Sequence, residues 1–208
     1  MQYANVNGER REASPNAKGE CPLCGSEVIS KCGNIKMHHW AHVSGSDECE
    51  SGKESESKEH RVFKEQFPEW CREVVHGSRR ADVLVGRFVV EYQKSNISFE
   101  DMLERTEDWN TLGYKVFWIL DYEKITSNFE RKNFETVSYR WKWMRQTIKK
   151  VFNENLNVSF YIKGLEDGKL FKIEKFYRKA LSGKLLDEKR FVKALKEKAL
   201  NGLQKHTA

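Results

Sequence analysis

The sequence predicts a mixed α/β (α+β) protein in which a small metal-binding module precedes a sheet-and-helix core and a basic C-terminal region. Four of the five cysteines and four of the six histidines fall within residues 21–60. Strand-like and helix-like segments alternate between residues 81 and 120. Residues 137–208 hold 18 Lys and Arg against 7 Asp and Glu. We expect a metal-binding module with a loose N-terminus at 1–50, the core at 51–136 and a basic extension packed on the core at 137–208.

The composition favours a globular protein that stays in the cytoplasm. The 208-residue chain contains six Trp, seven Tyr and twelve Phe, which is too many aromatic residues for a disordered chain. No apolar run approaches the roughly 18 residues that cross a membrane, and the first residues contain no apolar signal segment. We therefore predict a cytoplasmic protein with no membrane partner. In such a reducing compartment, an odd set of five cysteines indicates metal binding rather than a disulfide framework.

A pair of cysteines and a later pair of histidines form the predicted metal site. Two residues between the cysteines allow both thiolates to face one ion, and a second pair completes the tetrahedron that Zn²⁺ prefers. The expected ligands of this structural zinc site are Cys21, Cys24, His39 and His42. Because the histidine spacing is shorter than in common zinc fingers, Cys32 or Cys49 could replace either histidine, and His38 could replace His39. Unliganded side chains are the alternative.

The segment up to residue 120 predicts a hairpin followed by a helix and a parallel strand. The expected elements are a linker at 51–57, a helix ending at Pro68, strands at 81–85 and 88–93, a helix over 98–112 and a strand at 114–120. Gly86-Arg87 between the first two strands suits a two-residue hairpin loop with glycine first. The later strand, helix and strand predict a right-handed parallel crossover.

Two acidic residues on the predicted hairpin face each other. If the loop has two residues, Asp82 lies directly opposite Glu91. Their Cβ atoms are then expected about 4.5 to 5.5 Å apart, where like charges destabilise a sheet unless a cation lies between them. Gln93 projects on the same face as Glu91, because strand side chains alternate. The pattern indicates a divalent cation at this point of the sheet.

The preceding helix carries a third acid on its apolar side. At about 100° per residue, Glu56 shares a helix face with His60 and two phenylalanines, and Lys64 can reach the rim. A carboxylate on an apolar face needs a metal, a base or a reaction. Glu59 is the alternative to Glu56. All these acids could equally be exposed charges paired with nearby arginines, and His60 could be a hydrogen-bonded core residue.

The C-terminal region predicts two helices that flank a hairpin. We expect a helix over 138–152, strands at 157–162 and 169–173, and a basic helix over 187–203. Tyr139, Trp141 and Trp143 alternate with basic residues and could stack on unpaired bases, although tryptophans at helical spacing more often belong to a core. We expect the lysines of this region, Lys149 and Lys150 among them, to contact phosphates.

Seven short motifs together resemble the competence protein CoiA-like family. They occur in the family's order and spacing between residues 21 and 121. The motifs are Cys21-x2-Cys24, His39-Trp40-Ala41-His42, Glu56-Ser57-x2-His60-x3-Lys64, Arg80-Ala81-Asp82-Val83, Glu91-Tyr92-Gln93-x-Ser95-x-Ile97-Ser98, Arg105 and Trp118-Ile119-Leu120. Each motif is weak by itself, but seven in sequence are hard to produce by chance.

The resemblance implies a PD-(D/E)XK, or restriction-endonuclease-like, core of mixed β-sheet flanked by helices, behind a zinc-ribbon-like module. It implies that Glu56, Asp82 and Glu91 are the acids of the site. Gln93 stands where lysine is commonest in the superfamily, which changes how an attacking water is activated. A second departure is Trp40, where phenylalanine is usual, and it should alter only packing.

The function expected from these patterns and the resemblance is Mg²⁺-dependent hydrolysis of DNA in uptake, recombination or defence. Asp82 and Glu91 are expected to hold Mg²⁺ or Mn²⁺, while Gln93 orients water, Lys64 supplies positive charge and His60 relays a proton. The alternative is a catalytically inactive DNA-binding adaptor that uses the zinc module and the basic C-terminal region. We expect DNA as a partner, with a homodimer or a recombination or defence protein as further candidates.

Overall fold

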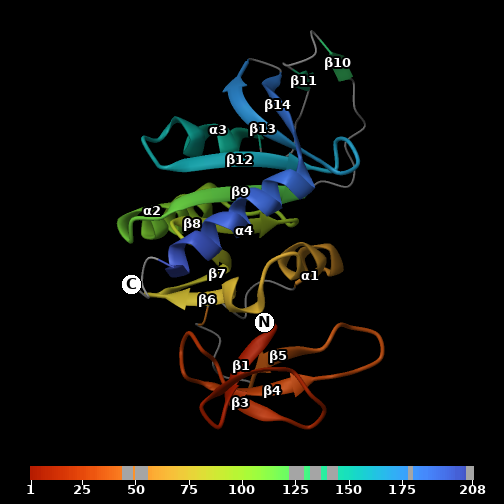
Figure 1. Ribbon diagram of the computed structural model, residues 1–208, viewed down its shortest axis with the longest axis vertical. Helices are drawn as coiled ribbons and strands as arrows, with labels where there is room; N and C mark the ends of the chain where they lie inside the picture. The colour runs from red at the N-terminus through yellow and green to blue at the C-terminus, as the bar shows by residue number, and fades with distance from the viewer. Residues whose placement is uncertain are drawn as a thin grey trace.

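The computed structural model contains two β-sheets and four α-helices, which confirms the mixed α+β fold class (Figure 1). It describes residues 1–43, 49, 56–121, 129–131, 137–139, 145–177 and 180–204. The smaller sheet is built from the N-terminal residues and lies at one end of the molecule, beside α1 and β6 of the larger sheet (Figure 1).

The N-terminal residues form a five-stranded antiparallel sheet, so the prediction of a loose N-terminus is wrong. The strands are β1 (Tyr3–Val6), β2 (Glu9–Glu12), β3 (Lys18–Glu20), β4 (Glu27–Lys31) and β5 (His39–His42), in the order β2-β1-β3-β4-β5. Asn7 and Gly8 join β1 to β2 with φ angles of 53° and 82°, as in the type I′ turns that close two-residue hairpins. Val28 and Trp40 are buried in the small core of this sheet.

The larger sheet has nine strands in the order β10-β11-β14-β13-β12-β9-β8-β7-β6. The strands are β6 (Arg72–His76), β7 (Arg79–Val85), β8 (Phe88–Gln93), β9 (Lys115–Asp121), β10 (Phe129–Arg131), β11 (Val137–Tyr139), β12 (Val158–Lys163), β13 (Lys169–Phe176) and β14 (Leu181–Asp187). Strand β9 runs parallel to both its neighbours, β8 and β12, whereas the other pairs are antiparallel.

The predicted hairpin and crossover are confirmed. Gly86 and Arg87 alone separate β7 from β8, and Gly86 adopts a φ of 55° that suits glycine. Helix α2 (Phe99–Thr111) begins after Ser98, whose side-chain oxygen accepts a hydrogen bond from the backbone N–H of Asp101 (3.0 Å). This helix returns the chain to β9, parallel to β8.

Helices cover both faces of the larger sheet. Helices α1 (Lys58–Glu65) and α4 (Glu188–Gln204) pack on one face, and α2 and α3 (Arg145–Asn153) pack on the other. Figure 1 shows α4 crossing in front of the strands. The buried side chains that anchor the helices include Phe63 in α1, Val192 in α4, Trp109 in α2 and Ile148 in α3.

The C-terminal prediction is partly right. The hairpin of β12 and β13 and the terminal helix are confirmed, but strand β14 was not expected. The helix predicted over 138–152 is wrong at its start, because Val137–Tyr139 is a strand that pairs with β14 and the helix begins at Arg145. Trp141, Trp143 and most of the linker expected at 51–57 lie outside the described residues. Among the helices that the structure describes, none combines the length and the apolar character that crossing a membrane requires.

Candidate functional site

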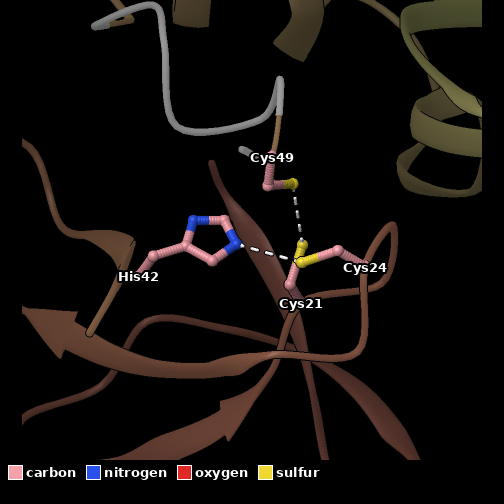
Figure 2. A group of neighbouring side chains, drawn as sticks. All are labelled: Cys21, Cys24, His42 and Cys49. Atoms are coloured by element: carbon pink, nitrogen blue, oxygen red, sulfur yellow. Dashed lines mark hydrogen bonds between the residues drawn. The ribbon is translucent and has the colours of Figure 1, made fainter. Parts of the chain in front are cut away.

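Four side chains of the N-terminal sheet converge as a candidate zinc site. Cys21, Cys24, His42 and Cys49 place their ligand atoms within 4.8 Å of one another (Figure 2). The Cys21 and Cys49 sulfurs are 3.9 Å apart, and the Cys24 sulfur is 3.4 Å from His42 Nε2. Ligands at about 2.0 to 2.3 Å from one Zn²⁺ ion have similar mutual distances in a tetrahedron. These four residues could therefore hold zinc, and four protein ligands would leave no open position for catalysis.

Cys49 replaces His39 in this set, so the prediction of His39 as a ligand is wrong. His39 and His42 belong to strand β5, in which residues three apart point to opposite faces. His42 faces the cysteines, whereas His39 Nδ1 donates to the carbonyl oxygen of Met37 (2.9 Å). The exchange of Cys49 for a histidine was among the expected alternatives, while Cys32 and His38 are not members of the group.

The environment of Cys24 favours metal binding. Slight burial acts to raise the pKa of its thiol, but hydrogen bonds with Ser26, His42 and Cys49 outweigh burial and lower this pKa to about 6. A thiolate is the form that binds metal. A tight turn also presents Cys21 and Cys24 together, because the backbone N–H of Gly25 donates to the carbonyl oxygen of Cys21 (2.9 Å).

Helix α1 carries a buried ion-pair cluster. Glu56 lies just before the helix, and its carboxylate contacts Lys64 Nζ (2.5 Å) and Arg61 Nε (2.8 Å). Burial acts to raise the pKa of Glu56, but Lys64 and Arg61 outweigh it and hold this pKa below its usual range. Lys64 has 1% of its side chain exposed, so it lies in the interior rather than at the rim. The alternative acid, Glu59, pairs instead with Lys94 (2.8 Å).

Glu73 on β6 is a member of this cluster that the sequence analysis missed. Its carboxylate contacts Lys64 Nζ (2.5 Å) and accepts hydrogen bonds from the backbone N–H of Gln2 (2.9 and 3.0 Å). Burial alone would raise the pKa of Glu73, but Lys64 and Arg80 hold it far below its usual range. A φ of 44°, rare for a residue other than glycine, interrupts the strand at Glu73, and no sequence pattern signals it.

Asp82 joins the same cluster from β7. Asp82 Oδ1 lies 3.0 Å from His60 Nε2, and Oδ2 accepts a hydrogen bond from the backbone N–H of Tyr92 (2.8 Å). The His60 ring stacks on Tyr92 with the ring centroids 4.9 Å apart. Burial acts to raise the pKa of Asp82, but His60 and Lys64 outweigh it and lower this pKa. The structure therefore brings together Glu56, His60, Lys64 and Asp82.

Glu91 and Gln93 point to the other face of the sheet. Glu91 Oε1 accepts a hydrogen bond from Trp109 Nε1 of α2 (3.0 Å), and Gln93 Nε2 donates to the carbonyl oxygen of Ser95 (2.9 Å). The regular pairing of β7 with β8 ends at Val83 and Val90, one pair before Asp82 and Glu91. Among the described residues, the zinc cluster is the single group of three or more Cys, His, Asp or Glu donors close enough to share an ion. The three carboxylates do not form a second group.

Comparison with known proteins places these residues in a protein family. The family model described as "Competence protein CoiA, nuclease-like domain" matches residues 56–176, and "Competence protein CoiA, N-terminal domain" matches residues 8–52. The first match contains Glu56, Asp82 and Glu91, and the second contains the cysteines of the zinc cluster except for none of its four ligands.

A curated relative supports the same assignment. The chain is 26% identical over 141 residues to "Competence protein CoiA" of Bacillus subtilis (strain 168). That similarity covers 60% of this chain and 36% of the Bacillus protein, so the chain spans well under half of its relative. No solved structure matches this chain.

Proposed function

Because this chain belongs to the competence protein CoiA family, we propose that it is a Mg²⁺-dependent nuclease that hydrolyses phosphodiester bonds of DNA at a PD-(D/E)XK-type site. The observation that carries the proposal is the environment of Asp82. Its carboxylate is largely buried and has a lowered pKa, next to His60 and the end of the β7–β8 ladder. Perturbed titratable groups of this kind concentrate at functional sites.

The donor chemistry of Asp82 and Glu91 fits a hard cation. Mg²⁺ prefers oxygen ligands and needs only one or two carboxylates, together with water and substrate phosphates. Asp82 accepts a hydrogen bond from Tyr92, the residue that follows Glu91, so the two acids belong to adjoining parts of β7 and β8. When bound, the ion would lower the pKa of a water ligand and neutralise charge on the phosphate. Cation binding would have to compete with the contacts of Asp82 to His60 and of Glu91 to Trp109.

The neighbouring side chains have distinct roles in this proposal. Lys64 remains protonated, because Glu73 and Glu56 outweigh the effect of burial and raise its pKa, and it keeps Asp82 ionised. His60 holds a proton at Nε2, beside Asp82 Oδ1, and can pass it toward the leaving group. Gln93 has its amide nitrogen fixed by Ser95, which leaves the amide oxygen to orient the attacking water. Glu56 positions Lys64.

Cleavage of labelled duplex, single-stranded and branched DNA with Mg²⁺, Mn²⁺ or EDTA tests the proposal. Asp82→Asn keeps an acceptor for the Tyr92 N–H but removes the charge, and we expect its rate to fall by at least about 100-fold. Asp167→Asn is the matched control, because Asp167 is an exposed acid in the β12–β13 loop. Cleavage by the Asp82→Asn variant at the wild-type rate would show that the assigned site is wrong.

A DNA-binding adaptor without catalysis is the second candidate. It is favoured by the hydrogen bond between Glu91 and Trp109 and by the lack of a second group of three or more metal donors among the described residues. The adaptor would bind DNA without cleaving it, and titration with Mn²⁺ would give no binding that depends on Asp82 or Glu91. A Mn²⁺ affinity that drops in Asp82→Asn would exclude the adaptor.

A further inference from the structure

Four lysines gather on the α4 side of the larger sheet, and we call Lys115, Lys172, Lys184 and Lys198 the lysine face. They come from β9, β13, β14 and α4. Lys172 lies directly opposite Lys184 in the antiparallel pair β13–β14, where like charges destabilise a sheet. Burial, then Lys172 and Lys198, lower the pKa of Lys115. The ammonium groups are therefore close enough to repel one another.

Aromatic rings hold two of these lysines in place. Lys198 Nζ lies 4.6 Å from the centre of the Phe88 ring, and Lys115 Nζ lies 5.6 Å from that of Phe117. The two rings stack on each other with centroids 5.2 Å apart. Lys198 also follows Leu195 on the side of α4 that packs on the sheet, because residues three apart share a helix face. The side chains are thus directed along the sheet surface, with their charges at its edge.

The lysine face has almost no internal counter-charge. Within the described residues, Lys115, Lys172 and Lys198 have no carboxylate at ion-pair distance, and Lys184 has one weak contact, to Glu174 (3.7 Å). The fold thus holds several positive charges together although they repel, and an external polyanion would relieve that repulsion.

We propose that the lysine face binds the phosphate backbone of nucleic acid, as a surface separate from the Asp82 and Glu91 site. Lysine ammonium groups contact phosphates as point charges and release counterions whatever the base sequence. Lys115 and Phe88 begin β9 and β8, whereas Gln93 ends β8. The strand between Phe88 and Gln93 extends about 17 Å, which is about five base pairs of duplex. The inference rests on the proposed function only in taking DNA as the ligand.

The test measures DNA binding by the full chain without cleavage. A fluorescein-labelled duplex is titrated in EDTA at several salt concentrations, and binding is followed by fluorescence anisotropy. The test variant is Lys115→Gln/Lys172→Gln/Lys198→Gln, and the matched control is Lys18→Gln/Lys169→Gln/Lys193→Gln. The control removes the same charge from lysines that already pair with carboxylates. In the test variant, we expect the slope of log affinity against log salt to fall by about 2 to 3, and in the control by less than about 1.

Two further readouts separate the outcomes. The test variant should melt no lower than wild type, because it removes repulsion between Lys172 and Lys184. Equal salt slopes in the test and control variants would overturn the proposal, as would a loss of binding to phosphatidylserine vesicles with DNA binding unchanged. If wild type binds through the lysine face but never cleaves, the nuclease proposal fails and the lysine face stands. If the test variant binds normally and wild type cleaves, the reverse holds.

Discussion

Replacing Glu73 by alanine tests the buried ion-pair cluster most directly. Glu73 has 3% of its side chain exposed and contacts Lys64, of which 1% is exposed. The substitution leaves Lys64 with Glu56 as its remaining carboxylate partner among the described residues. It also removes the acceptor of the Gln2 backbone N–H. The fold would keep a buried ammonium with half of its compensation.

The expected loss of stability follows from these contacts. Removing one partner of a buried ion pair costs about 3 to 5 kcal/mol, because the other charge stays buried. Leaving a backbone N–H without its acceptor costs about 1 to 3 kcal/mol when it is buried. Because Glu56 still neutralises Lys64 in part, we expect Glu73→Ala to lower the free energy of unfolding by about 4 kcal/mol. In a chain of this size that corresponds to a melting temperature about 8 to 16 °C lower.

Urea and thermal unfolding, followed by tryptophan fluorescence and circular dichroism, measure this loss. Glu27→Ala is the matched control, because Glu27 pairs with Lys18 at an exposed site, with 54% and 75% of the side chains exposed. We expect the control to lose less than about 1 kcal/mol. Lys64→Met combined with Glu73→Gln should lose less than the sum of the single changes, since the two charges interact. A loss below about 1 kcal/mol in Glu73→Ala would refute the argument.

Three further predictions concern the metal, acid and a close backbone contact. Cys49→Ser should lose zinc on dialysis, whereas His39→Asn should retain about one ion per chain, as measured by elemental analysis. The stability that Glu73 adds should be complete above about pH 5 and disappear as the pH falls toward its lower folded pKa, so urea unfolding of wild type and Glu73→Gln should converge in acid. Gly183→Ala should destabilise by about 1 to 3 kcal/mol or more, because its Cβ would collide with the Lys172 carbonyl oxygen. Gly33→Ala meets no atoms and should melt like wild type.

Local patterns were sufficient to predict the centre of the fold. The hairpin at Gly86 and the helix that starts after Ser98 are each specified by a few adjacent residues, and both were predicted correctly. The Asn7-Gly8 turn is an equally local signal for a hairpin. Strand β11 could not be found in this way, because Val137–Tyr139 is too short to show a pattern and pairs with the distant β14.

The candidate site was predictable in its members more than in its partners. Glu56 faces inward as its helix position predicts, but its partners are Lys64 and Arg61 rather than a metal. The choice of zinc ligands depended on the strand at His39–His42, since a strand turns the two histidines apart. Glu73 escaped prediction because its role depends on a backbone distortion and on contacts with a separate sheet.

The contacts of Glu73 connect the two sheets and the candidate site. One carboxylate accepts the Gln2 N–H at the start of the smaller sheet and contacts Lys64 in α1 of the larger unit. Lys64 in turn is one of the charges that lower the pKa of Asp82. The same cysteines and histidine that gather at the zinc cluster belong to the smaller sheet and its loops. Any change that releases β1 from Glu73 therefore loosens Lys64 and weakens the attraction that keeps Asp82 ionised.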